Sequence, residues 1–202
     1  MKRLLMGVVL LSSAGLANAQ ESKQDKLWDA SLGLGFPHFV SVQGMRHINE
    51  KLSLGVSGGY SLIPESTKPC GAKVKMSGVN MEVASRYHLT GSSFFGGLNL
   101  GYQHFKTNSV QTTIPGSDYD ITDGIKVFYV TPHIGWFKTY ASGFSIGTEW
   151  GLRLPFANTR YTDRSGPGNY TPDVQDSVDK GMDAMAKKPM PFATLIRIGY
   201  AF

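Results

Sequence analysis

The sequence has little cysteine, little charge and no long apolar segment after its first twenty residues. Cys70 is the single cysteine among 202 residues, so an internal disulfide is impossible and a disulfide-stapled scaffold is excluded. Charged residues make up 17% of the chain, against roughly 25% in an average soluble domain. The longest later stretch without Asp, Glu, Lys or Arg runs from Tyr87 to Phe105 and is too polar to cross a bilayer as a helix, which needs about 20 mostly apolar residues.

Glycine and aromatic residues are abundant instead. The chain holds 24 glycines, and aromatic residues make up 11% of it. This composition favours short, well-paired β-strands over amphipathic soluble helices. Apolar and aromatic residues are spread along the whole chain, which argues against disorder.

The N-terminus has the pattern of a secretory signal. Lys2 and Arg3 precede an apolar stretch over residues 4–16, and Ala17-Asn18-Ala19 has the small-x-small form of a cleavage site. We therefore expect residues 1–19 to be removed before Gln20, leaving a short segment over residues 20–26 ahead of a domain over residues 27–202. The alternative is a buried N-terminal helix. Removal of Lys2 and Arg3 lowers the formal net charge of +5 by two. The positive charge that remains is too small to predict a nucleic-acid partner.

The rest of the chain alternates with a period of two. In residues 52–62 every second residue is apolar, except at Gly58, whereas the intervening positions hold only Ser and Gly. That period indicates a strand with one apolar and one polar face. Eight such segments are predicted, and they cover residues 28–36, 39–47, 52–62, 74–88, 94–103, 125–138, 144–154 and 192–202.

The polar faces carry Gly, Ser, Ala and Asn with an occasional charge, and the apolar faces carry large side chains. Small polar residues toward a narrow interior and large apolar residues outside are typical of a transmembrane barrel. The sequence thus predicts an all-β fold, an eight-stranded antiparallel up-and-down transmembrane β-barrel.

Aromatic residues lie near both ends of the strands, as two membrane interfaces require. One predicted belt comprises Trp28, Phe94, Trp136, Phe144, Tyr200 and Phe202, and the other comprises Phe36, Tyr60, Tyr102, Phe128, Phe156 and Phe192. The connections at 48–51, 89–93 and 139–143 are short, whereas 63–73, 106–124 and 157–190 are long. Bacterial barrels place short turns in the periplasm, so both termini are expected there. Pro132, within the sixth strand, implies a bulge or a missing ladder bond.

Residues 27–202 resemble the small eight-stranded outer-membrane barrels of Gram-negative bacteria, of the OmpA, OmpX and opacity-protein type. The most specific motif is the last strand, which alternates and ends in Ile198, Tyr200 and a terminal Phe202. In that family such an ending is the signal read by the barrel assembly machinery. The resemblance implies a bacterial outer-membrane location, with outer-membrane lipid and lipopolysaccharide as surroundings.

Five charged residues fall on the interior parity of their strands: Glu82, Arg86, Glu149, Arg153 and Arg197. Because single charges buried in a narrow barrel are costly, we expect them to pair as a structural network that fills the interior. Glu149 and Arg197 should lie at similar depth, with Glu82 approaching from across the barrel. A gate or ion path is the functional alternative.

Two lipid A-modifying barrel enzymes of similar size provide the comparison for catalysis. Arg46-His47-Ile48-Asn49 is superficially similar to the deacylase motif but has Asn49 where Ser is required. No other histidine is followed two residues later by serine, and no pattern supplies a nucleophile with its base. We therefore predict no enzymatic activity, no catalytic residues and no cofactor.

Two features belong to the long connections. Residues 118–124 concentrate acids, but their spacing fails the EF-hand pattern, so a solvated loop without metal is expected. After Thr171-Pro172, Val174, Val178, Met182 and Met185 recur at helical spacing. That spacing predicts a short helix that caps the mouth, lies on the outer leaflet or a partner, or packs on neighbouring loops.

The function most consistent with these features is a non-enzymatic outer-membrane barrel, expected to be a monomer. Its extracellular loops would serve envelope integrity or bind a surface partner that the sequence does not identify. A lipid A-modifying barrel enzyme and a narrow small-solute channel are the alternatives.

Overall fold

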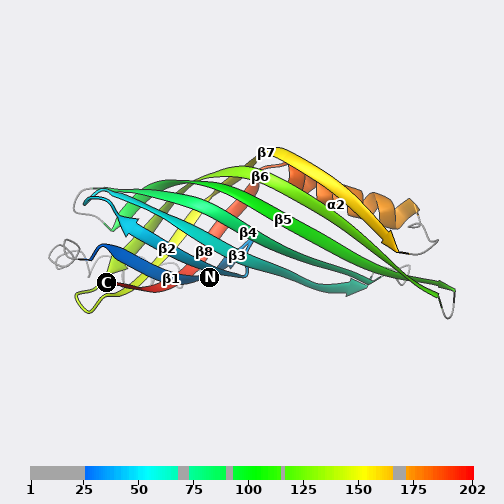
Figure 1. The fold of residues 1–202 in the computed structure, drawn as a ribbon, viewed down its shortest axis with the longest axis horizontal. Helices are drawn as coiled ribbons and strands as arrows, with labels where there is room; N and C mark the ends of the chain where they lie inside the picture. The colour runs from blue at the N-terminus through cyan, green and yellow to red at the C-terminus, as the bar shows by residue number, and fades with distance from the viewer. Residues whose placement is uncertain (1–25, 68–72, 90–92, 115–116, 166–171) are drawn as a thin grey trace, which may run out of the picture.

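The computed structural model describes residues 26–67, 73–89, 93–114, 117–165 and 172–202. The predicted signal segment and Cys70 lie outside these ranges. Eight strands pair in chain order, each antiparallel to the next, and β8 returns to pair with β1. The predicted closed eight-stranded up-and-down barrel is therefore confirmed (Figure 1). In order, the strands are β1 (Trp28–Phe36), β2 (Val40–His47), β3 (Leu52–Thr67), β4 (Lys73–His88), β5 (Phe94–Ile114), β6 (Ser117–Thr139), β7 (Phe144–Ser165) and β8 (Met190–Ala201).

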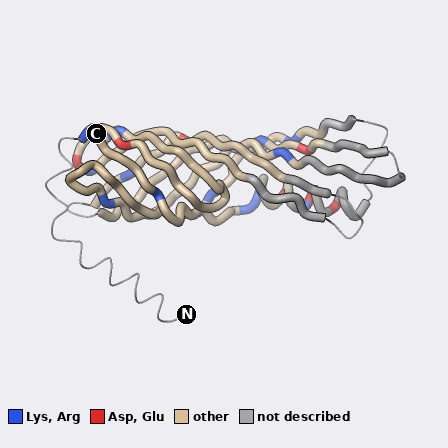
Figure 2. Tube along the Cα trace, turned by 90° about the horizontal axis from the view of Figure 1, so that it is seen from below, with Lys and Arg blue, Asp and Glu red and all other residues tan. Residues whose placement is uncertain are grey.

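The strands are unequal in length, so one side of the barrel projects further than the other. β5, β6 and β7 have 21, 23 and 22 residues, whereas β1 and β2 have 9 and 8. Figure 1 shows the long strands running on past the short ones at one end, and Figure 2 shows the same barrel from below. The turn at the opposite end between β6 and β7 uses Gly143, whose φ of 94° lies in the left-handed region that favours glycine.

The projecting strands correct the sequence prediction, which assigned residues 106–124 and much of 157–190 to loops. β5 and β6 remain paired from Phe94↔Trp136 out to Ile114↔Ser117, so the acidic segment 118–124 is strand. The apolar alternation stops near residue 105 although the backbone ladder continues. A β-ladder depends on backbone hydrogen bonds alone. The alternation of apolar and polar residues, by contrast, requires an apolar environment on the outer face of the strand.

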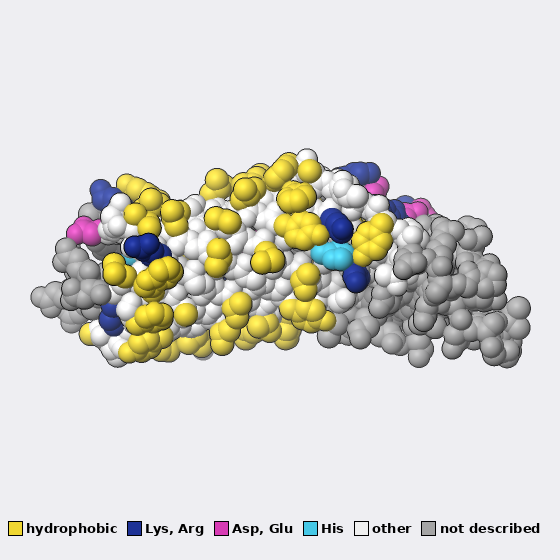
Figure 3. Space-filling model, in the orientation of Figure 1, with side chains coloured by type: hydrophobic (Ala, Val, Ile, Leu, Met, Phe, Trp, Pro, Cys, Tyr) yellow, Lys and Arg dark blue, Asp and Glu magenta, His cyan; other side chains and the backbone are white. Residues whose placement is uncertain are grey.

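The outer surface carries a broad belt of apolar side chains (Figure 3). These side chains are 42–72% exposed although they are large and hydrophobic. Members from around the wall include Leu32, Val42, Val56, Met81, Val83, Leu98, Leu100, Ile134, Trp150 and Ile198. The interior is polar, and it buries residues such as Gln43, Asn80 and Thr131. The barrel is therefore inside out relative to a water-soluble protein.

A bulge in β8 makes one part of the predicted register wrong. Arg197 pairs with Gly147, but the next β7 pair joins Thr194 to Glu149, and the pairing with β1 shifts at the same place. Leu195 and Ile196 both face outward, at 70% and 38% exposure. The extra residue reverses the parity beyond it.

Thr194 and Phe192 consequently point inward, with exposures of 3% and 7%. Phe192 is therefore not part of an aromatic belt, contrary to prediction; its ring lies 6.2 Å from that of His133 inside the barrel. The other predicted belt residues are exposed or half-exposed. At Pro132 the register is unchanged, but the β6–β7 pairing stops at Val130 and resumes at His133. This gap is the interruption that a proline without a backbone N–H produces.

One α-helix, α2 (Pro172–Lys187), lies in the described part of the chain, where the periodicity predicted it. It runs beside β6 and β7 on the projecting part of the wall (Figure 1). No helix of the described ranges has both the length and the apolar character needed to cross a membrane.

Candidate functional site

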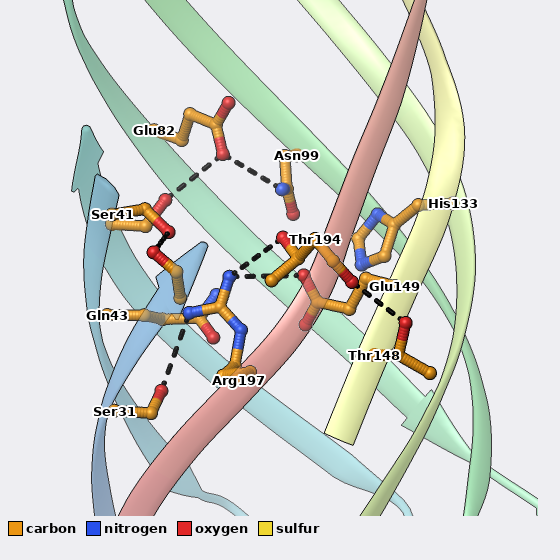
Figure 4. Close-up of polar contacts among 12 residues, drawn as sticks. Ser31, Ser41, Gln43, Glu82, Asn99, His133, Thr148, Glu149, Thr194 and Arg197 are labelled. Carbon is orange, nitrogen blue, oxygen red and sulfur yellow. Dashed lines mark hydrogen bonds and ion pairs between the residues drawn. The ribbon is translucent and has the colours of Figure 1, made fainter. Parts of the chain in front are cut away.

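The polar interior is organised around two buried carboxylates, and the first of these is Glu149 on β7. Arg86 from β4 donates to its Oε1, and Arg197 from β8 donates to its Oε2 at 3.3 Å. Arg197 also reaches Ser31 Oγ at 3.5 Å and Thr194 Oγ1 at 3.4 Å (Figure 4). The Glu149 side chain is 1% exposed. Three strands distant in sequence are thus joined through one carboxylate.

Glu82 on β4 is the second carboxylate and accepts four hydrogen bonds. Arg153 Nη2 and the Tyr129 hydroxyl donate to Oε1 at 2.9 and 2.7 Å. Ser57 Oγ and Asn99 Nδ2 both donate to Oε2 at 3.0 Å. Four donors satisfy the hydrogen-bonding capacity of this buried side chain.

Aromatic rings complete the two layers. The Arg153 guanidinium lies 3.9 Å from the centre of the Tyr129 ring. Gly101 makes room for that ring, because a Cβ there would come within 2.4 Å of it. Arg86 lies 4.8 Å from the Phe95 ring and 5.1 Å from the Phe137 ring. Cation–π contacts of this kind add to the ion pairs when the cation is desolvated.

All five charged residues selected from the sequence face the interior and take part in these contacts. Arg197 forms an ion pair with Glu149, the residue expected at a similar depth, whereas the ion pair of Glu82 goes to Arg153. Ile198, Tyr200 and Phe202 are 45–64% exposed on the outer surface. The network also includes Gln43, Gln103, Asn99 and Tyr129. Strand parity alone places Asn99 and Gln103 inside the barrel. It does not show that these two, or Gln43 and Tyr129, belong to the network.

A small internal cavity adjoins both layers, with room for about one water molecule. Its lining includes His38, Asn80, Glu82, Asn99 and Arg197. His38 Nε2 and the amide oxygens of Asn80 and Asn99 have no hydrogen-bond partner among the described residues. A bound water would satisfy polar atoms of this kind.

Histidine–serine contacts occur inside the described part of the barrel, although the sequence pattern indicates none. His38 Nδ1 lies 2.8 Å from Ser61 Oγ, and His47 Nδ1 lies 2.8 Å from Ser53 Oγ. His47 Nε2 is also 3.4 Å from Asp29 Oδ2, so an aspartate, a histidine and a serine lie in a row. The paired histidine and serine come from different segments, 23 and 6 residues apart, which a search for short motifs does not detect.

Access to the second pair is restricted. Ser53 is 1% exposed, and its Oγ is also 3.2 Å from His88 Nε2. A nucleophilic serine must reach the reacting atom of a substrate, whereas this hydroxyl is enclosed by two histidines. Within the described ranges, no group of three or more His, Cys, Asp or Glu side chains is arranged to hold a metal ion.

The helix α2 closes the projecting end of the interior. Met182 and Ala186 are 0% and 2% exposed and pack against Phe105, Ile125 and Val127. These three lie on the inward face of β5 and β6, so the described apolar side chains of the helix pack on strands.

A polar contact anchors the helix at a second point. Arg160 on β7 binds Asp179 of α2 and lies 3.8 Å from the buried Asp123. On the exposed side of α2, the hydrogen bond and the charge of Asp176 raise the pKa of Lys180. The described part of the helix is therefore held by both apolar and charged contacts.

Comparisons with known proteins support the fold. No protein-family model and no curated protein matches the sequence. The structure is similar to that of a major outer membrane protein from Thermus thermophilus, with a TM-score of 0.59 and 10% identity, over 87% of this chain and 97% of that one. CarO2 and CarO of Acinetobacter baumannii give TM-scores of 0.49 and 0.48 at 11% and 10% identity, over 89% and 90% of this chain and all of theirs.

Proposed function

We propose that this chain is an integral, non-enzymatic barrel of a bacterial outer membrane. In this proposal both termini lie in the periplasm, and the projecting strands and α2 stand at the cell surface, where they serve envelope integrity or bind a partner. The observation that carries it is the belt of exposed apolar side chains around a closed barrel with buried charges. The fold it shares with the Thermus outer membrane protein supports this location.

The physical argument rests on solvation. In water, a belt of large side chains at 42–72% exposure would be costly and prone to aggregation. In a bilayer the same belt is matched to its surroundings, and the closed ladder leaves no strand edge unpaired in the lipid. The interior pairs then stabilise a wall that has no hydrophobic core of the usual kind.

The first test is fractionation of cells that express the full chain. We expect the protein in the outer membrane, beginning at Gln20, with a faster-running band on unheated gels because the closed barrel resists detergent. Lipid A from these cells should have the same mass spectrum as lipid A from cells without the chain. Recovery in the soluble periplasm, or a new lipid A species that depends on Ser53, would contradict the proposal.

Conductance tests the channel alternative. Glu149, Arg86 and Arg197 fill one level of the lumen, and Glu82, Arg153 and Tyr129 fill another. Eight strands leave an interior just wide enough for side chains. Folded protein in a planar bilayer should therefore conduct near the lipid baseline. Steady single-channel steps that disappear in Arg153→Ala or Arg197→Ala would show that ions pass.

A further inference from the structure

A basic patch lies on the outer face of the barrel, at the edge of the apolar belt. Figure 3 shows two basic side chains on either side of a histidine, bordered by hydrophobic side chains. The patch consists of Lys106 and His104 on β5, Lys126 on β6 and Tyr161 on β7. Both lysines are exposed, and the other two residues are partly exposed.

The strand register holds these four residues together. His104 pairs with Lys126, and Lys106 pairs with Gly124, which in turn pairs with Tyr161. The two lysines are thus diagonal neighbours on one face, a separation of about 7–8 Å between their backbones. His104 Nε2 lies 2.8 Å from the Tyr161 hydroxyl, and Lys126 Nζ lies 5.9 Å from the centre of the Tyr161 ring.

Neither lysine forms an ion pair with a described residue. Three other cations of the projecting end are matched: Arg160 binds Asp179, Lys180 binds Asp176 and Lys187 binds Asp183. Among the described side chains, Lys106 and Lys126 therefore present two ammonium groups without a counter-charge. Because their backbones are close and their side chains are long, both can donate to a single anion with several oxygens.

The neighbours below the patch are apolar. Tyr102 pairs with Phe128 one step down the same face, and Phe128 and Phe156 are 48% and 62% exposed. An anion bound by the two lysines would hence be next to a surface suited to acyl chains. A soluble anion would contact only the lysines, whereas an amphiphile would contact both the lysines and the apolar surface.

We propose that Lys106, Lys126 and His104 bind the phosphate of an outer-leaflet glycolipid of the lipid A type, whose acyl chains lie along Tyr102, Phe128 and Phe156. This inference rests on the proposed outer-membrane location. Two observations favour a phosphorylated lipid as the ligand. The lysines are complementary in charge to a phosphate, and the patch lies at the level of the headgroup phosphates when the apolar belt spans the hydrocarbon.

The test uses folded full-length barrel in neutral detergent and two lipid probes, bisphosphorylated lipid A and the same lipid with its phosphates removed. Binding is measured by native mass spectrometry across a lipid titration. The variant Lys106→Gln, Lys126→Gln should bind the phosphorylated probe about 30-fold more weakly, as two contacts of about 1 kcal/mol each are lost. The matched control Lys180→Gln, Lys187→Gln removes two paired lysines and should bind like the wild type.

The outcomes separate this inference from the proposed function. Equal binding by the patch variant and the wild type, or equal binding of the two probes, would overturn the phosphate site even where the barrel fractionates with the outer membrane. Competition by millimolar inorganic phosphate would show that a free anion suffices and would also overturn it. Unheated gel mobility checks that each variant is folded.

Discussion

Replacing Glu149 with glutamine is expected to destabilise the folded barrel by about 3–5 kcal/mol. The substitution keeps the shape of the side chain but leaves Arg86 and Arg197 buried without the carboxylate that they share. Unfolding of the vesicle-inserted barrel by guanidinium, followed by tryptophan fluorescence, measures the change. The effect is large because a buried cation without its counter-charge loses both hydration and pairing.

Two further variants make this result specific to the interior. Asp176→Asn breaks an exposed pair with Lys180 and should leave stability close to that of the wild type, because solvent screens the pair. The double variant Glu149→Gln, Arg86→Gln should be more stable than Glu149→Gln alone, because one of the uncompensated cations is gone. A Glu149→Gln barrel as stable as the wild type would show that the network does not hold the wall together.

Leu98→Arg is expected to cost about 2–4 kcal/mol of stability in a bilayer. Leu98 is 52% exposed and lies midway along β5 between the rim residues Phe94 and Tyr102, so the charge would be placed near the centre of the hydrocarbon. The same unfolding experiment in vesicles gives the free energy. In a water-soluble barrel an exposed Leu→Arg change would have little effect.

Thr159→Arg is the matched control. Thr159 is exposed on the outer face beside Lys126, beyond the apolar belt. The cost of a charge falls to about 0–1 kcal/mol near the interface. Equal effects at Leu98 and Thr159 would contradict a membrane position for the belt.

The fold could be predicted largely because a barrel wall imposes a period of two. Residues 79–87 show why: Val79, Met81 and Val83 face out at 50–72% exposure, while Asn80 and Glu82 are buried. The pattern fails where its physical cause ends. Beyond about residue 105 the apolar alternation stops, so Lys106 to Gly124 read as loop although the strands remain paired.

The sequence predicts which charged residues belong to the interior network, but it predicts only part of the ion pairs that they form. Parity places Arg153 and Glu82 inside, yet which cation meets which carboxylate depends on strand stagger and on the bulge at Leu195. A single inserted residue leaves almost no trace in an apolar sequence. It nevertheless turned Phe192 from a rim residue into an interior one, and brought Thr194 within 3.4 Å of Arg197.

The His47–Ser53 contact shows a different limit. The two residues lie on β2 and β3 across a short turn, and the third member, Asp29, comes from β1. Their proximity follows from register and inward parity together. The register and the parity are known only once the strand bounds are fixed. A search for linear motifs compares residues at a fixed spacing along one segment and therefore does not find this contact.

The pairing of β8 with β1 has a consequence for the order in which the chain folds. Seven of the eight strand contacts join neighbours in sequence, but this last one joins residues as far apart as Ser31 and Arg197. Its loop-closure entropy is the largest, so its pairing is the slowest step that topology imposes. Arg197 can already meet Glu149 when β7 pairs with β8, because these two strands are neighbours in sequence, whereas its bond to Ser31 forms only when β8 pairs with β1. The ion pair of Arg86 with Glu149 crosses the interior from β4 to β7, so it requires the curvature of the sheet and links closure of the cylinder to neutralisation of its interior.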